Sequence, residues 1–68
     1  MAPTPRQMGK RLKRLRVGKD MSQAALAKRA GLTREYVNKL EAGKQDPSLT
    51  TISALAKALG VPVTALLE

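Results

Sequence analysis

The sequence predicts a compact all-α fold, a single domain of five helices in residues 5–68. Its apolar residues recur at spacings of three and four, which is the period of a helix that buries one face. Glycine or proline, and a serine or threonine that can act as a cap, lie near the expected helix ends. β-branched runs, strict alternation and Asn-Gly turns are absent from the 68 residues, so no segment favours a strand.

The first helix is expected at about Pro5–Val17, after a flexible arm at residues 1–4. Thr4 can cap this helix, and Gln7 can reach back to the backbone of Thr4 as in a capping box. Proline suits the first helical position because its missing N–H would have no partner there. The apolar residues expected on the buried face are Met8, Leu12 and Leu15.

Residues 22–42 are predicted to form a helix-turn-helix, two short helices that cross steeply with few residues between them. Ser22 and Thr33 can cap the two helices, and Gly31 can adopt the left-handed conformation that such a turn needs. Gly43 is expected to end the second of these helices. Leu26, Val37 and Leu40 are expected to fill the angle between the helices, and Ala27 is the small residue expected where the two backbones meet.

The last third of the chain is expected to hold two more helices. Ser48 begins a helix that Gly60 ends, and a short segment after Pro62 and Thr64 ends at Leu67. The longer helix is expected to bury one stripe formed by Leu49, Ile52, Leu55, Ala56 and Leu59.

The charge of the chain is strongly positive and unevenly distributed. Thirteen Lys and Arg residues against five Asp and Glu residues give a net charge of +8 at pH 7. Twelve of the basic residues lie in residues 1–44, whereas residues 45–68 are nearly neutral. A polyanion is the natural partner of the basic part, and the last third is expected to serve another contact.

The composition also excludes several classes of function. Cysteine and histidine are absent, which removes thiol and imidazole catalysis and the usual zinc and haem ligands, so no enzyme, metal or cofactor is expected. A single tyrosine is the only aromatic residue, which argues against a binder of single strands that stacks bases. No apolar run is long enough to span a membrane and the N-terminus lacks a signal peptide, so we expect a cytoplasmic protein.

Three segments of the chain carry a resemblance to a known family. They are MSQAALAKRAGLTREYVNKLEAGK (Met21–Lys44), DPSLTTISALAKALGV (Asp46–Val61) and LKRLR (Leu12–Arg16). With these segments the chain resembles the lambda-repressor-like family of helix-turn-helix regulators, of the Cro or xenobiotic-response-element type. The resemblance implies a transcriptional regulator, of repressor or controller type, that binds double-stranded DNA and associates with the nucleoid. It also implies that the third helix enters the major groove of a palindromic operator.

The resemblance assigns roles to individual residues. Gln23 matches a position that contacts phosphate and braces the third helix, Thr33 matches a phosphate-contacting cap, and Tyr36 lies near the DNA backbone. Ala42 and Lys44 match a loop that meets phosphate, and Arg16 and Glu41 match a partly buried ion pair. The positions that match base-facing residues are Arg34, Glu35, Asn38 and Lys39, which share one face of a helix beginning after Thr33.

The chain departs from the family pattern at Ala25, where a glutamate often closes a capping box, and at Ala42, where Asn or Arg is frequent. Glu35 can alternatively complement the positive end of its helix, and the basic residues of the first helix can form a solvated face. A two-fold homodimer is expected because two recognition helices then reach successive major grooves. The interface expected for it comprises Val61, Val63, Leu66 and Leu67, although in so small a domain some of these residues are also expected to close the core of the single chain. The alternative function is an antitoxin, which would cover a protein toxin and regulate its own operon.

Overall fold

The computed structural model describes residues 2–68, so Met1, the first residue of the expected arm, lies outside the described residues. Within this range the chain forms five helices and no strand, which confirms the all-α prediction. The helices are α1 (Pro5–Gly18), α2 (Gln23–Ala30), α3 (Arg34–Glu41), α4 (Leu49–Leu59) and α5 (Thr64–Leu67). They pack into a body of 30 × 23 × 21 Å.

Four of the helices begin at a side-chain cap. Each capping oxygen accepts a hydrogen bond from the backbone N–H three residues later, a contact that contributes about 1 kcal/mol. The capping residues are Thr4, Ser22, Thr33 and Ser48. Gln7 completes a capping box at Thr4, whereas Ser22 has only its bond from the Ala25 N–H because alanine offers no side chain in return.

The turn between α2 and α3 depends on Gly31, which has φ 72°. A residue with a Cβ is strained in this left-handed region, whereas glycine adopts it freely. The Leu32 N–H then donates to the Ala27 carbonyl oxygen at 2.8 Å, which closes the end of α2. Thr33 follows at once as the cap of α3, so the turn is short and fixed at both sides.

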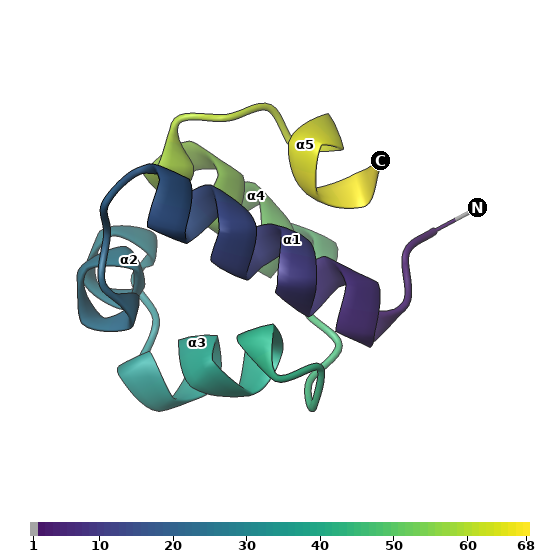
Figure 1. The fold of residues 1–68 in the computed structure, drawn as a ribbon, viewed down its shortest axis with the longest axis horizontal. Coiled ribbons are helices and arrows are strands. Elements are labelled where there is room, and N and C mark those ends of the chain that lie inside the picture. The colour runs from purple at the N-terminus through teal and green to yellow at the C-terminus, as the bar shows by residue number, and fades with distance from the viewer. Residues whose placement is uncertain (1) are drawn as a thin grey trace.

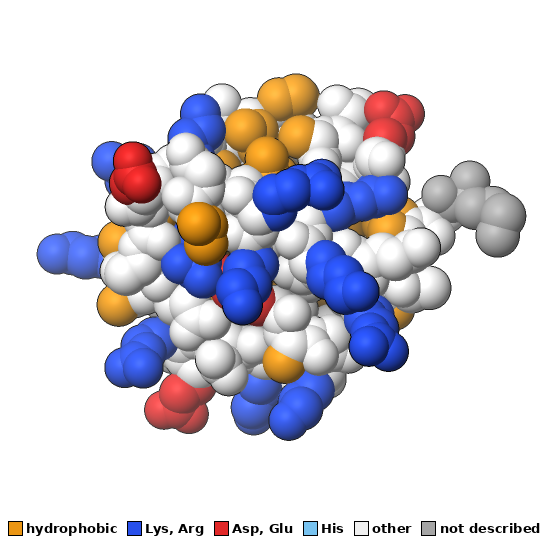
Figure 2. All heavy atoms as spheres, in the orientation of Figure 1, with side chains coloured by type: hydrophobic (Ala, Val, Ile, Leu, Met, Phe, Trp, Pro, Cys, Tyr) orange, Lys and Arg blue, Asp and Glu red, His pale blue; other side chains and the backbone are white. Residues whose placement is uncertain are grey.

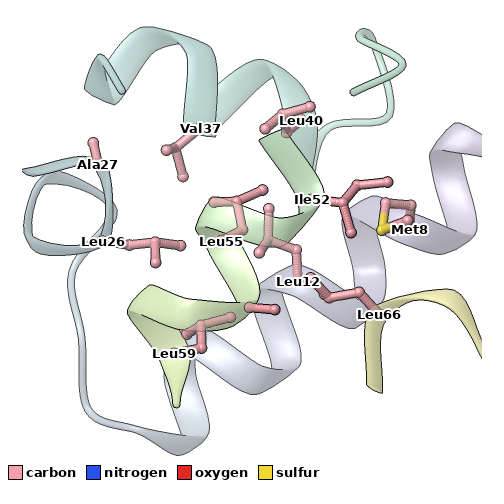
Figure 3. Close-up of a cluster of buried hydrophobic side chains, with 11 residues drawn as sticks. Met8, Leu12, Leu26, Ala27, Val37, Leu40, Ile52, Leu55, Leu59 and Leu66 are labelled. Atoms are coloured by element: carbon pink, nitrogen blue, oxygen red, sulfur yellow. The ribbon is translucent and has the colours of Figure 1, made fainter. Parts of the chain in front are cut away.

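The core forms between the five helices, where α1 packs on α3 and α5, and α2 packs on α3 and α4 (Figure 1). The buried side chains converge from all five helices (Figure 3). They are Met8, Leu12, Leu26, Ala27, Val37, Leu40, Ile52, Leu55, Ala56, Leu59 and Leu66. Each fully buried leucine contributes about 1.5–3 kcal/mol, which makes this cluster the main source of stability.

Two expectations about apolar residues are wrong. Leu49 was expected in the buried stripe of α4, but its side chain is 66% exposed. Residues 48–50 are all exposed, because the packed part of α4 begins one turn later at Ile52. Leu66 was expected in a dimer interface, but it is 0% exposed and belongs to the core of the single chain. In so small a domain the core needs its last helix to cover it.

α1 crosses α3 at Gly9, a close approach that the sequence analysis did not identify. Gly9 is buried, and a Cβ added there would meet the Leu40 carbonyl oxygen and lie 2.7 Å from that of Glu41. Both atoms belong to the backbone of α3 and cannot turn away as a side chain can. Glycine therefore sets the distance between α1 and the end of α3.

We expect Gly9→Ala to lower the free energy of unfolding by about 1–3 kcal/mol, because the added methyl group forces the two helices apart. Gly18→Ala is the matched control, since an added Cβ at this last residue of α1 meets nothing within 4 Å. The control should leave stability unchanged or raise it by about 0.4–1 kcal/mol. Urea unfolding followed by circular dichroism measures both variants, and equal midpoints would contradict the close crossing.

Candidate nucleic-acid interface

The exposed face of α3 presents a group of polar and charged side chains. An open hollow on this face is lined by Thr33, Arg34, Glu35, Asn38 and Lys39. All five residues are exposed, while Val37 and Leu40 on the opposite side of the helix are buried. The structure thus brings together the four residues expected to face base edges and the cap expected to meet phosphate.

Three of the expected DNA-binding residues, Gln23, Tyr36 and Lys44, do not line this hollow. Tyr36 is half-buried and packs against the core, so only part of its ring is accessible. Lys44 is exposed in the loop after α3, where a flexible ammonium group can reach a phosphate. Ala42 is the residue at the end of α3, and its methyl side chain leaves only the backbone for a polar contact.

Basic side chains are concentrated on α1, which packs against α3. Figure 2 shows Lys and Arg side chains over the visible face of α1 and along the edge of the molecule where α3 lies. The α1 sequence PRQMGKRLKRLRVG contains no acidic residue, so its cations are not balanced within the helix. The potential near α3 is therefore positive, which favours a polyanion.

The end of α3 is held by an ion pair with α1. Arg16 donates from Nε to Glu41 Oε2 at 2.6 Å and from Nη2 to Glu41 Oε1 at 3.0 Å. The two side chains are only 11% and 4% exposed. The hydrogen bond with Glu41 raises the pKa of the Arg16 guanidinium above its ordinary value, although burial opposes this shift. Arg16 also donates from Nη1 to the Met21 carbonyl oxygen at 2.7 Å, which ties in the segment before α2.

Gln23 connects this ion pair to the exposed face of α3. Its Nε2 donates to Glu41 Oε1 at 3.1 Å, and its Oε1 accepts from Asn38 Nδ2 at 3.3 Å. Both ends of the amide are thus engaged with α3. Gln23 was expected to brace the third helix, but neither partner could be predicted from the sequence, because these hydrogen bonds join separate helices and produce no regular residue spacing.

The residues expected in a dimer interface lie at the edge of the molecule opposite α3. The segment between α4 and α5 passes over the top of Figure 1, and hydrophobic side chains gather there in Figure 2. Val61, Val63 and Leu67 are partly exposed and pack against the core from outside. α5 is also held by Arg11, whose Nη1 donates to the Leu66 carbonyl oxygen at 3.2 Å.

Residues 2–68 contain neither a candidate metal cluster nor a candidate membrane-spanning helix. No group of three or more acidic residues gathers as a metal-binding cluster there, and no helix is long and apolar enough to cross a membrane.

A family model described as "Helix-turn-helix" matches residues 12–66, most of the chain. The chain belongs to this helix-turn-helix family. The match runs from α1 through α5 and includes both helices of the predicted motif. It confirms the resemblance to lambda-repressor-like regulators that the sequence indicated.

Individual relatives of this helix-turn-helix chain are regulators. The immunity repressor protein of Bacillus phage phi105 is 39% identical over 59 residues, which cover 87% of this chain and 41% of the repressor. Control protein C.BamHI of Bacillus amyloliquefaciens is 38% identical over 61 residues, which cover 88% of this chain and 75% of that protein. The chain therefore spans about two fifths of the length of the phage repressor.

A solved structure matches the helix-turn-helix chain over almost its full length. The restriction-modification controller protein C.AhdI from Aeromonas hydrophila superposes with a TM-score of 0.91 and is 40% identical. The match covers 93% of this chain and 96% of that one. The five-helix arrangement is therefore the fold of a known controller protein.

We expect Arg16→Ala to lower the free energy of unfolding by about 3–5 kcal/mol, because it leaves the Glu41 carboxylate buried without its partner. The double variant R16M/E41L removes both charges and fills the same space with apolar side chains. It should be less destabilised than Arg16→Ala, since a well-packed apolar pair commonly equals a buried ion pair in stability. Thermal unfolding compares the variants, and a double variant less stable than the single one would contradict this account.

Proposed function

We propose that the chain is a sequence-specific regulator of transcription, of repressor or controller type, that binds a palindromic DNA operator as a homodimer through α3. The observation that carries this proposal is the face of α3, where five hydrogen-bonding side chains line an open hollow and the opposite side of the helix is buried. Membership of the helix-turn-helix family supports it, as do relatives that are named as a repressor and a control protein.

The chemistry of α3 suits the major groove. A groove about 12 Å wide admits an α-helix, and its base edges carry a distinct donor and acceptor pattern for each base pair. Arg34 can bind guanine O6 and N7 together, and Lys39 can donate to the same atoms. Asn38 can pair with adenine, and Glu35 can accept from cytosine N4. These side chains are exposed and stand on a rigid support.

The phosphate backbone supplies most of the affinity in this proposal. Thr33 lies at the start of α3, where backbone N–H groups and the helix dipole favour an anion. Lys44 flanks the same helix on its other side. Contacts of this kind fix the register of a protein on the duplex, and they weaken as the salt concentration rises.

The proposed dimer uses the neutral edge around Val61, Val63 and Leu67. These side chains are partly exposed and apolar, so two copies can bury them against each other. Such a dimer has to hold its two α3 helices about 34 Å apart, the distance between successive major grooves.

The proposal is tested by selecting bound sites from a random pool of double-stranded DNA and measuring affinity for the winner at several salt concentrations. A palindromic motif bound at least about a thousandfold more tightly than random DNA is the expected result. Binding to all sequences alike, with steep salt dependence, would overturn the proposal and leave only an electrostatic attraction.

We expect Arg34→Ala to weaken binding to the selected site by about 1–3 kcal/mol and to relax the preference at one base position. Lys44→Ala is the comparison, because a phosphate contact carries no sequence information. It should weaken binding to all sequences nearly equally and reduce the salt slope by about 1. Titrations of selected and scrambled duplexes separate the two effects, and a uniform loss for Arg34→Ala would reassign Arg34 to the phosphates.

We expect light scattering at high micromolar concentration to give the mass of a dimer, and Leu67→Lys to give the mass of a monomer with an unchanged helical spectrum. Leu66→Ala is the contrasting variant, because Leu66 is buried in the core of one chain. It should lower the free energy of unfolding by about 2–5 kcal/mol rather than act on the interface. A strictly monomeric mass for the unaltered protein would contradict the proposed dimer.

A further inference from the structure

A chain of hydrogen bonds runs from the buried ion pair to the exposed face of α3. Arg16 donates to Glu41, Gln23 donates to the same carboxylate, and Asn38 donates to Gln23. The side chain of Arg16, the first member of this chain, is 11% exposed, and Asn38, the last member, is exposed and lines the hollow. The chain therefore links the interior of the domain to a side chain that can touch a base.

The direction of these bonds is dictated by the Glu41 carboxylate. A carboxylate only accepts hydrogen bonds, so Gln23 has to turn its Nε2 towards Glu41. The amide is planar and two-sided, so its Oε1 then faces Asn38, which has to turn its Nδ2 towards Gln23. Each amide is oriented by the group before it. The opposite orientation would place two oxygens or two N–H groups against each other.

The outcome at the exposed end is that Asn38 directs its Oδ1 away from Gln23. Its second N–H is also left unused by the bond to Gln23. The side chain thus offers an acceptor together with one donor. Adenine presents the complementary pair in the major groove, N6–H as donor and N7 as acceptor, and cytosine presents a donor at N4. Guanine and thymine present acceptors there and no donor.

We infer that Gln23 and Glu41 are positioning residues for base recognition, which orient the Asn38 amide so that it selects adenine first and cytosine second. This inference rests on the proposed function and goes beyond it, because it assigns the choice of base to two residues behind the reading face. Glu41 touches no base in this account. It acts through Gln23, and its charge determines which atom Asn38 presents.

Two variants of Gln23 test the inference while the Arg16–Glu41 pair remains intact. Gln23→Met has a similar length but neither donor nor acceptor, so it releases Asn38 to turn freely. In Gln23→Lys the ammonium group can donate hydrogen bonds to both Glu41 and Asn38. It cannot accept a hydrogen bond from Asn38, because it has no acceptor. Asn38 is then expected to turn its Oδ1 towards the lysine and to present Nδ2 to the base. Both substituents favour a helix, and melting curves check that the domain stays folded.

The measurement is the affinity for four duplexes that differ only at the base position where Asn38→Ala removes the preference. For the unaltered protein the order is adenine, then cytosine, then guanine and thymine. Gln23→Met should reduce the adenine preference by about tenfold, and Gln23→Lys should move the preference to guanine or thymine. Ala24→Lys is the control, because it adds the same charge at an exposed neighbouring position outside the hydrogen-bond chain. It should tighten binding to all four duplexes equally.

The outcomes separate the inference from the proposed function. An unchanged order of bases in both Gln23 variants would overturn the orienting role and leave the DNA-binding proposal intact. A loss of affinity that is equal for all four duplexes would do the same, since it would make Gln23 a phosphate contact. Absence of any selected motif for the unaltered protein would overturn both.

Discussion

The contact between α1 and the end of α3 is the constraint on which the rest of the structure depends. α3 has only eight residues, too few for a helix that is stable alone in water. It is held at its start by the Thr33 cap, along one side by the core, and at its end by α1. At that end the backbones approach closely at Gly9, and the Arg16–Glu41 pair lies beside them. Because these contacts hold α3 at both ends and on its buried side, the side chains on its outer face are not needed to keep the helix in place.

The ion pair contributes geometry more than stability. The free energy needed to remove two charges from water is about as large as the free energy of their attraction. An apolar pair of similar size would therefore stabilise the contact between the helices equally well. An apolar pair would slide, however, whereas a guanidinium fork on a carboxylate fixes distance and angle together. Arg16 also binds the Met21 carbonyl oxygen, so one side chain sets the relative positions of α1, α3 and the start of α2. Recognition of base edges tolerates little movement, and the pair supplies that rigidity.

The sequence predicted well what depends on neighbouring residues. The caps at Thr4 and Ser22 and the glycine turn at Gly31 are local, since a side chain or φ angle meets the backbone within a few residues. The exposed face of α3 followed from its 3.6-residue period. Leu49 and Leu66 were misplaced because periodicity shows which residues share a face but not where packing begins or ends. The close approach at Gly9 and the bonds of Gln23 depend on how separate helices cross, which no local pattern encodes.

α1 joins the two surfaces to which we assign functions. On one side Arg16 and Gly9 hold the end of α3, and on another Arg11 donates to the last turn of α5. One helix of fourteen residues therefore contacts both α3, which we propose to read DNA, and α5, which lies at the proposed dimer edge. In the proposed dimer this matters, because the spacing of two α3 helices has to match that of successive grooves. A flexible connection would lose binding free energy to ordering, so in the proposed complex Arg11 and Arg16 contribute to recognition without touching a base.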